Sequence, residues 1–502
     1  MSEARQTVRN AGWLVVQRGL HLAGATLFAL VVPRLMGPEV FGRYSLLTSV
    51  SMWFAMLSGL GAVSLMARVV PQFTAAGDTF GLRKLVTNLL VLRAFAGAFT
   101  ATGYFLIVAL ALGEPDYVAA LLVALAVFTR TVGNLCYSLF LGLNQAARWG
   151  LGDLMRRVLT LAGVLIGFPI AGLRGACAGF AIANVVVLVV GLSGAWRYLL
   201  WTSLDLRRSY LAPYLRTGTS FAAGNLLLAL AQRSGETVVR LATANYMQVG
   251  YYGAAYSIYL TGAHALWQGA LSFGPLLVRL LATGQLSEVT SWLERLLKWM
   301  FIVASLASLA TLLMGGTLVP LVLGAAYRPV ADCLWPLVLA LFALAVSSIG
   351  RLSALALDRP GLSATAAAVE LVTFWGLGSV LASRFGALGM AVAALAGTIG
   401  YAAVVSWRVH GDLPYSPRSA VMAAGLALVF VPLVLLRGPW QVNTALLAVA
   451  VAGYVSLLLW RRVITVGEIA ALRRVVQRRG PTPAPSVQGP DPAADLLDRG
   501  GE

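Results

Sequence analysis

The chain has 502 residues, of which 59% are hydrophobic and only 11% are charged. An ordinary soluble domain carries roughly 25% charged residues, and a soluble chain of this length divides into domains with polar surfaces. The composition therefore excludes a soluble globular protein and predicts an all-α integral membrane protein. The net charge of +18 would suggest nucleic-acid binding in a soluble protein. Here the basic residues lie between apolar runs, so they indicate membrane topology and no nucleic-acid partner.

Transmembrane helices are the first elements that the sequence predicts. A hydrocarbon core about 30 Å thick needs about 20 apolar residues of helix. Fourteen segments satisfy this, at 11–32, 44–66, 85–112, 117–140, 155–171, 176–196, 217–236, 251–273, 299–319, 333–357, 363–383, 387–407, 419–436 and 442–460. Most Lys and Arg residues fall in alternate loops and in the C-terminal tail, so the positive-inside rule places both termini in the cytoplasm. We expect a multi-pass protein of the cell inner (plasma) membrane.

A weak internal repeat runs through the chain. FGRY at 41–44 aligns with VGYY at 249–252, an offset of 208 residues. Two further matches share an offset of 214 residues, namely GLNQ at 142–145 with ALDR at 356–359, and GLRGA at 172–176 with GALGM at 386–390. Two six-helix lobes related in this way are an arrangement typical of transporters, which rock one lobe against the other.

The repeat predicts the domain organisation. We expect an N-terminal lobe at 1–200, a C-terminal lobe at 201–410 and two appended transmembrane helices within 411–460. Residues 461–479 are basic and amphipathic, which predicts a helix on the anionic cytoplasmic leaflet. Residues 480–502 are rich in Pro, Gly and Asp, which predicts a disordered tail.

The first loops resemble a known family. The carrying segments are Asn10, RLMGPEVFGRYSLLTSV at 34–50, LSGLGAVSLMAR at 57–68 and GLRKLVTNLLVLR at 81–93. They are similar to the polysaccharide transporter (oligosaccharide flippase) family of the multidrug/oligosaccharidyl-lipid/polysaccharide exporter superfamily. The resemblance implies alternating access between two lobes. It also implies a polyprenyl-pyrophosphate-linked oligosaccharide as substrate, flipped to the outer leaflet for O-antigen (lipopolysaccharide), exopolysaccharide or a similar glycan, with a glycan polymerase and glycosyltransferases of the same pathway as candidate partners.

Charged residues inside the predicted spans are the candidate site. An Arg at mid-membrane costs about 2.5–3.5 kcal/mol on the insertion scale, so it is expected to face a cavity or a partner. A cationic cavity would neutralise a pyrophosphate, and the planar guanidinium suits phosphate geometry. The candidate substrate-binding residues are Arg18, Arg93, Arg130, Arg233 and Arg351.

Structural alternatives stay open for several of these arginines. Arg93 and Arg351 lie close enough to span ends to extend toward the membrane surface. Arg233 has Glu236 three residues later on its own helix, so salt bridging competes with ligand binding there. Glu236 and Glu370 are candidates for ion coupling or for pairing with an arginine.

Catalytic chemistry finds no support in the pattern. The three cysteines and three histidines show no metal-ligand spacing, so no metal site, cofactor or catalytic residue is expected. Glu114 and Asp116 flank Pro115 and are interpreted as turn residues. A membrane-embedded glycan polymerase or ligase is therefore the weaker alternative. A cation-coupled drug or metabolite antiporter of the same superfamily is the stronger one, although the first six spans contain no carboxylate to bind a coupling ion.

Overall fold

The computed structural model describes residues 3–59, 61–200, 204–207, 210–211, 226–357 and 359–464; the side chains of residues 3–18, 21, 62–64, 275, 355 and 360 are outside that description. Every regular element in these ranges is a helix, which confirms the all-α prediction. The predicted amphipathic segment 461–479 beyond Ile464 and the tail 480–502 lie outside the described residues.

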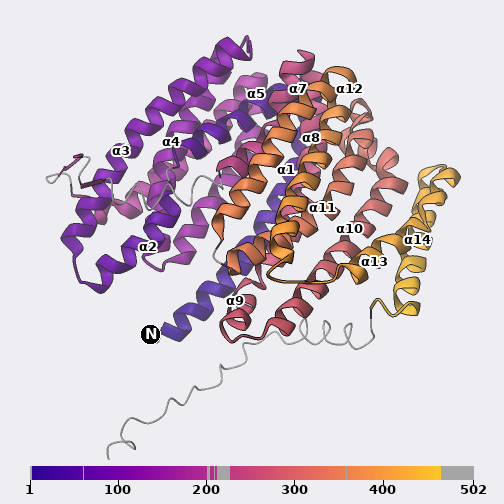
Figure 1. The fold of residues 1–502 in the computed structure, drawn as a ribbon. Helices are drawn as coiled ribbons and strands as arrows, with labels where there is room; N and C mark the ends of the chain where they lie inside the picture. The colour runs from indigo at the N-terminus through magenta and orange to yellow at the C-terminus, as the bar shows by residue number, and fades with distance from the viewer. Residues whose placement is uncertain are drawn as a thin grey trace, which may run out of the picture.

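The helices form two groups and an appended pair (Figure 1). α2, α3 and α4 lie on the left of the view, α1 runs through the middle, and α10 and α11 lie to its right, with α13 and α14 at the far edge. The first group comprises α1 (Glu3–Leu57), α2 (Ala62–Ala75), α3 (Thr79–Leu106), α4 (Tyr117–Gly142) and α5 (Ala146–Ala195). The second comprises α7 (Gly235–Thr243), α8 (Tyr246–Leu271), α9 (Gly274–Ala282), α10 (Leu286–Leu323), α11 (Val330–Ala356) and α12 (Pro360–His410). The pair is α13 (Arg418–Leu428) and α14 (Trp440–Trp460), which pack on α10.

Three long helices fold back on themselves. α5 has 50 residues, which would measure about 75 Å if straight, more than twice the hydrocarbon thickness. Its backbone dihedrals depart from helical values at Ala171 and Gly172. The backbone of Gly167, before this break, is in direct contact with the backbone of Gly175, after it. The two arms are therefore antiparallel, and the closely spaced predicted spans 155–171 and 176–196 correspond to them.

α1 and α12 reverse direction in the same way. In α1 the break is at Gly37, and the rings of Phe28 and Tyr44 have centroids 6.3 Å apart. Along a straight helix these residues would be about 24 Å apart. In α12 the break is at Gly386, and Gly389 packs on the backbone of Leu381.

The breaks in α5 and α12 are equivalent positions of the sequence repeat. Gly172 has φ 57° and ψ −136°, and Gly386 has φ 58° and ψ −133°. The two glycines are aligned at the offset of 214 residues. A side chain is strained at these dihedrals, so only glycine makes both turns at low cost. The shared conformation supports a duplication.

Substituting either turn glycine is expected to destabilise the fold. Gly172→Ala and Gly386→Ala should each cost about 1–3 kcal/mol, because alanine must adopt a sparsely populated backbone conformation. Thermal unfolding of the purified protein in detergent measures the loss. The matched control is Gly376→Ala within α12, where a methyl group meets open space. A control that loses as much as the turn variants would contradict the strain argument.

The described residues contain ten helices long and apolar enough to span a membrane, three of which carry the breaks described above. The count of fourteen crossings stays a prediction, because most of the predicted span 217–236 lies outside the described residues. The predicted span 44–66 does not correspond to one helix. It is interrupted between Leu57 and Ala62, and α2 continues to Ala75. Gly59 and Gly61 lie in this interruption, which a hydrophobicity window does not detect.

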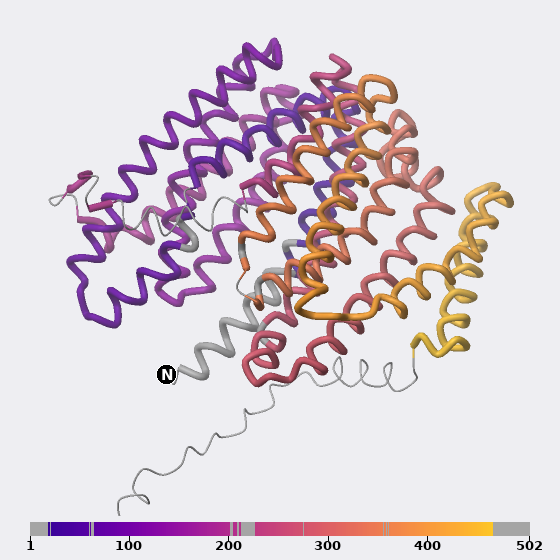
Figure 2. Tube along the Cα trace, in the orientation of Figure 1, coloured from indigo at the N-terminus to yellow at the C-terminus, as the bar shows by residue number. Residues whose placement is uncertain are grey.

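α1 makes the main contacts between the two groups, chiefly with α8. A Cβ built on Gly42 would lie 1.9 Å from the Tyr246 carbonyl oxygen, and one built on Gly250 would lie 1.8 Å from the Pro38 carbonyl oxygen. Pro38 and Tyr246 are equivalent in the repeat, as are Gly42 and Gly250. This reciprocal contact is the pattern that a two-fold axis produces. The lobe boundaries at 200 and 410 stay predictions, whereas the two helix groups are a feature of the structure (Figure 2).

Candidate functional site

Arg130 lies within electrostatic range of three other arginines, Arg156, Arg157 and Arg233, and we call these four residues the arginine cluster. Arg130 lies on α4, and Arg156 and Arg157 lie on the first arm of α5. Arg233 precedes α7, in the second group. Since α4 begins at Tyr117, Arg130 lies about 20 Å along the helix from that end, well inside a 30 Å hydrocarbon core.

The arginine cluster contains more guanidinium groups than carboxylates to pair with them. Arg157 pairs with Asp153 at 3.2 Å, and Arg156 donates to the Asn134 amide oxygen at 2.9 Å. The Nε of Arg156 is buried and has no partner within the described residues. Arg130 and Arg233 make no side-chain hydrogen bond or ion pair in the described part of the chain. Asp153 is the one carboxylate close to Arg130 there. Arg130 and Arg233 are therefore the guanidinium groups of the cluster that have no partner in the described residues.

Two of the five arginines predicted as substrate ligands are in the cluster, Arg130 and Arg233. Arg93 is 4% exposed and donates to the carbonyl oxygens of Ser58 and Gly59, so it closes the end of α1. Arg351 lies 3.8 Å above the Trp267 ring, in the second group. The side chain of Arg18 lies outside the described residues.

Arg156 and Arg157 are residues that the sequence reasoning assigned elsewhere. It counted both among the cytoplasmic charges, because they lie at the first residues of the predicted span 155–171. α5 instead begins at Ala146, more than two turns earlier, which places both arginines within the helix. Asp153, one turn before Arg157 on the same helix, was the available signal.

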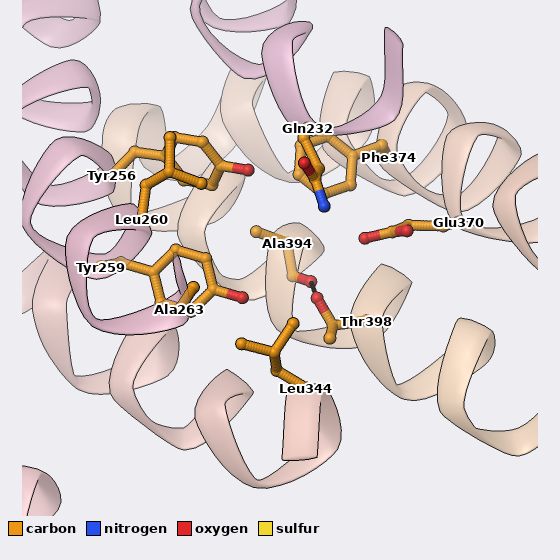
Figure 3. A pocket seen from close by; sticks show the side chains of 10 residues that line it. All are labelled: Gln232, Tyr256, Tyr259, Leu260, Ala263, Leu344, Glu370, Phe374, Ala394 and Thr398. Carbon is orange, nitrogen blue, oxygen red and sulfur yellow. Dashed lines mark hydrogen bonds between the residues drawn. The ribbon is translucent and has the colours of Figure 1, made fainter. Parts of the chain in front are cut away.

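A small polar cavity lies within the second group (Figure 3). Glu370 from α12 and Tyr259 from α8 point into it, with Gln232 and Thr398 at its wall. Glu370 is 5% exposed, and Arg351 is the cation within its electrostatic range. The cavity is a place where a carboxylate, an amide and hydroxyls converge, as in sites for small cations.

A polar network joins the two groups at the end of the molecule that carries residues 33–43, 112–116, 240–250 and 321–328, here called the Glu114 end. The Glu114 side chain is fully buried and pairs with Arg43 of its own group. It also accepts a hydrogen bond of 3.0 Å from the Tyr246 hydroxyl of the second group. Arg240 lies 4.0 Å from the Tyr246 ring centroid and donates to the Leu112 carbonyl oxygen at 3.4 Å.

Two further hydrogen-bonding contacts hold the same end closed. Arg34 of α1 donates to the Leu321 carbonyl oxygen at 3.0 Å, and the Tyr327 hydroxyl donates to the Pro33 carbonyl oxygen at 2.8 Å. Glu114 is therefore more than the turn residue that the sequence predicted. Its role depends on α8, more than a hundred residues later, and no local pattern indicates that contact.

The neighbouring carboxylate Asp116 stays within the first group. It caps α4 by accepting from the Ala119 N–H, and Arg174 pairs with it at 3.0 Å. Burial by itself would raise the pKa of Asp116, but the Ala119 N–H and the Arg174 guanidinium outweigh burial and hold the pKa below its usual value. Asp116 is a half-buried carboxylate of the same loop that makes no hydrogen bond or ion pair with the second group in the described structure. Its substitution is therefore a control for substitution of Glu114.

Glu114→Gln is expected to open the Glu114 end. The Tyr246 hydroxyl then loses its charged acceptor across the interface, and a hydrogen bond to a charged group contributes about 1.5–3 kcal/mol. Spin labels at Tyr117→Cys and Arg328→Cys, both exposed and on different groups, measure the separation. The label distance should lengthen in Glu114→Gln and stay unchanged in Asp116→Asn. Equal distances in both variants would show that the network does not hold the groups together.

No family model matches the sequence, and no curated protein matches it either. Solved structures do match. A multidrug resistance MATE family transporter of the MOP superfamily, in an inward-facing conformation, aligns with a TM-score of 0.66 at 16% identity, over 78% of this chain and 94% of that chain. The lipid II flippase MurJ, in an inward closed conformation, aligns with a TM-score of 0.63 at 13% identity, over 91% of this chain and 100% of that chain.

A MOP superfamily transporter from Pyrococcus furiosus also aligns, with a TM-score of 0.56 at 16% identity, over 81% of this chain and 95% of that chain. The chain is thus a multi-pass membrane protein with a transporter fold. That fold is the one of the MOP superfamily, the exporter superfamily that the sequence resembles. At these identities the likeness extends to the fold, and membership of the polysaccharide transporter family stays a prediction.

Proposed function

We propose that the protein flips a polyprenyl-pyrophosphate-linked oligosaccharide from the cytoplasmic to the outer leaflet by alternating access. The observation that carries the proposal is the arginine cluster. Arg130 and Arg233 come from different helix groups and lack partners in the described residues, so an anion could bind both. The planar, permanently charged guanidinium binds phosphate oxygens in a bidentate manner.

Burial in a membrane makes these contacts specific for a strongly anionic ligand. A pyrophosphate moving through hydrocarbon would carry unpaired charge, which is prohibitively costly. Arg156 and Arg157 of α5 contribute positive charge from the first helix group. Arg233 contributes positive charge from the second. Because the contacts come from both groups, their relative motion can carry the pyrophosphate across while the lipid tail stays in the bilayer.

The Glu114 end fits the same cycle. By the predicted topology it faces outward, with both termini in the cytoplasm. Its closure by the Glu114 network leaves the opposite end as the side from which a substrate would enter. A glycan polymerase and glycosyltransferases of the same pathway are the proposed partners.

A second candidate function rests on the cavity at Glu370. A cation bound by Glu370, Gln232 and Thr398 would suit a cation-coupled drug or metabolite antiporter. The arginine cluster opposes this for cationic drugs, because it would repel them. An antiporter for an organic anion is compatible with both sites, and the experiment below separates it from a flippase.

The experiment is lipid analysis of a strain that lacks the gene. We expect one pyrophosphate-linked oligosaccharide to accumulate, inaccessible to a membrane-impermeant probe, and to be restored to the outer leaflet by the wild-type gene. An unchanged lipid pool together with an unchanged surface glycan would refute the flippase and favour the antiporter.

A further inference from the structure

A second buried carboxyl group lies between the helix groups. Glu236, on α7, is 4% exposed. Its Oε1 accepts a hydrogen bond of 3.3 Å from the Ser45 hydroxyl on α1, across the interface. Its Oε2 is buried and has no partner among the residues that the structure describes. The contact therefore leaves half of the carboxyl group unsatisfied.

Three helices converge on this carboxyl group. The Ser45 hydroxyl oxygen would lie 2.7 Å from a Cβ built on Gly253, so α1 and α8 are tightly packed beside it. The Tyr252 hydroxyl lies against Gly235, next to Glu236, and it too is buried without a partner in the described ranges. Tyr256 stacks on Tyr252, with ring centroids 5.3 Å apart. Glu236 thus sits in a tightly packed site among hydroxyl groups.

Charged groups around Glu236 do not neutralise it. Arg233, three residues earlier, is the nearest cation, but it makes no ion pair with Glu236 in the described structure. On α1 the charged residue nearest to Ser45 in sequence is Arg43, which pairs with Glu114. On α8 the facing groups are the two tyrosines, and Glu370 of α12 lies beyond Tyr256. An ionised carboxylate in this position would be desolvated and unpaired.

We propose that Glu236 is a proton-binding site that couples protonation to closure of the Glu114 end. A buried carboxylate without a partner is strongly disfavoured, whereas the neutral acid costs little and its hydroxyl can donate a hydrogen bond. The closed interface therefore holds the proton on Glu236. When the groups separate, Ser45 leaves, water reaches the carboxyl group and the proton dissociates.

One proton binds to Glu236 each time the Glu114 end closes, and one proton dissociates each time it opens. Closure converts Glu236–COO⁻ and one proton from the adjacent solution into Glu236–COOH, and opening reverses this. By the predicted topology that solution is the outer one, so external acid favours closure after the substrate has left. This inference goes beyond the proposed function, because it holds for any substrate that the two groups carry.

The test measures the Glu114 end without substrate. The full chain carries spin labels at Tyr117→Cys and Arg328→Cys, in lipid nanodiscs without oligosaccharide. The three native cysteines, all buried, are replaced by alanine: Cys136, Cys177 and Cys333. We expect the short label distance to gain population as pH falls from about 8 to about 5, since protonation stabilises the closed form. In Glu236→Gln the short distance should dominate at every pH.

Glu370→Gln is the matched control, because it neutralises the other buried carboxyl group of the second helix group. It should keep the wild-type pH response. A pH response that persists in Glu236→Gln, or that disappears in Glu370→Gln instead, would overturn the proposal.

If Glu236→Gln does not fold, Ser45→Ala replaces it. The Ser45 hydroxyl donates to the carboxylate and so stabilises the ionised form of Glu236 in the closed state. Without it the short distance should lose more population at pH 8 than at pH 5, and an equal loss at both pH values would overturn the proposal. Lipid analysis of the deletion strain is independent of all these outcomes, so the two hypotheses fail separately.

Discussion

Arg130→Gln and Arg156→Gln will each reduce transport by roughly 10- to 100-fold while leaving the protein inserted. Each substitution removes a charge-assisted contact worth about 1.5–3 kcal/mol, and about 1.4 kcal/mol corresponds to a factor of ten. Glutamine retains an amide that can donate a hydrogen bond, so the loss of transport measures the contribution of the positive charge. The measurement is restoration of the surface glycan in the deletion strain, normalised to protein in the membrane.

The matched control for these variants is Arg148→Gln. Arg148 lies on α5 with Arg156, is exposed and donates to the Gln145 side-chain oxygen at 2.9 Å. It should retain wild-type activity. Arg130→Lys should recover part of the loss, because lysine keeps the charge without the bidentate geometry. Full activity in Arg130→Gln and Arg156→Gln at normal expression would refute the cationic site.

Gly42→Ala is expected to be among the most damaging additions of a single methyl group to the described chain, together with Gly250→Ala at the equivalent position of the repeat. Its Cβ would lie 1.9 Å from the Tyr246 carbonyl oxygen and 2.8 Å from the Gly250 amide nitrogen, and backbone atoms cannot move aside without moving α8. Overpacking of this kind costs about 1–3 kcal/mol or more. The helices must separate, so we expect both a lower unfolding temperature and a longer distance between labels at the Glu114 end.

Two alanine substitutions on the same helices should act in the opposite direction. Gly24 on α1 and Gly262 on α8 have open space where a Cβ would be. Alanine there should stabilise by about 0.5–1 kcal/mol, because it restricts the unfolded backbone and favours the helix. If Gly42→Ala were as stable as Gly24→Ala, the α1–α8 crossing would not be the tight contact described above.

Helix positions were predictable because lipid imposes a simple rule. A segment without water must satisfy its own backbone hydrogen bonds and must be apolar, so hydropathy locates spans such as α4, α11 and α14 within a few residues. Turns between closely spaced spans were predictable from the repeat, because Gly172 and Gly386 are aligned in it. The interruption between Leu57 and Ala62 was missed, because hydropathy averages over breaks in the backbone.

The candidate site was only partly predictable. Arg130 and Arg233 stood out because a charge inside a span is costly. Arg93 met the same criterion, yet it binds carbonyl oxygens at the end of α1. Arg156 was counted as a cytoplasmic charge at the start of the predicted span 155–171, because hydropathy alone does not show that α5 begins at Ala146. A charged residue within a predicted span can therefore have any of several structural roles, and the sequence does not distinguish them.

The sequence by itself determined that this protein is an all-helical membrane protein with an internal repeat, because composition and periodicity record burial in lipid. The tertiary structure decided which charges meet. Glu114 contacts Tyr246, Glu236 contacts Ser45 and Arg130 lies near Arg233, each pair brought together from different helix groups. Such pairs depend on how α1 crosses α8, through backbone contact at Gly42 and Gly250. Sequence separation carries no information about that geometry, so only the folded chain shows it.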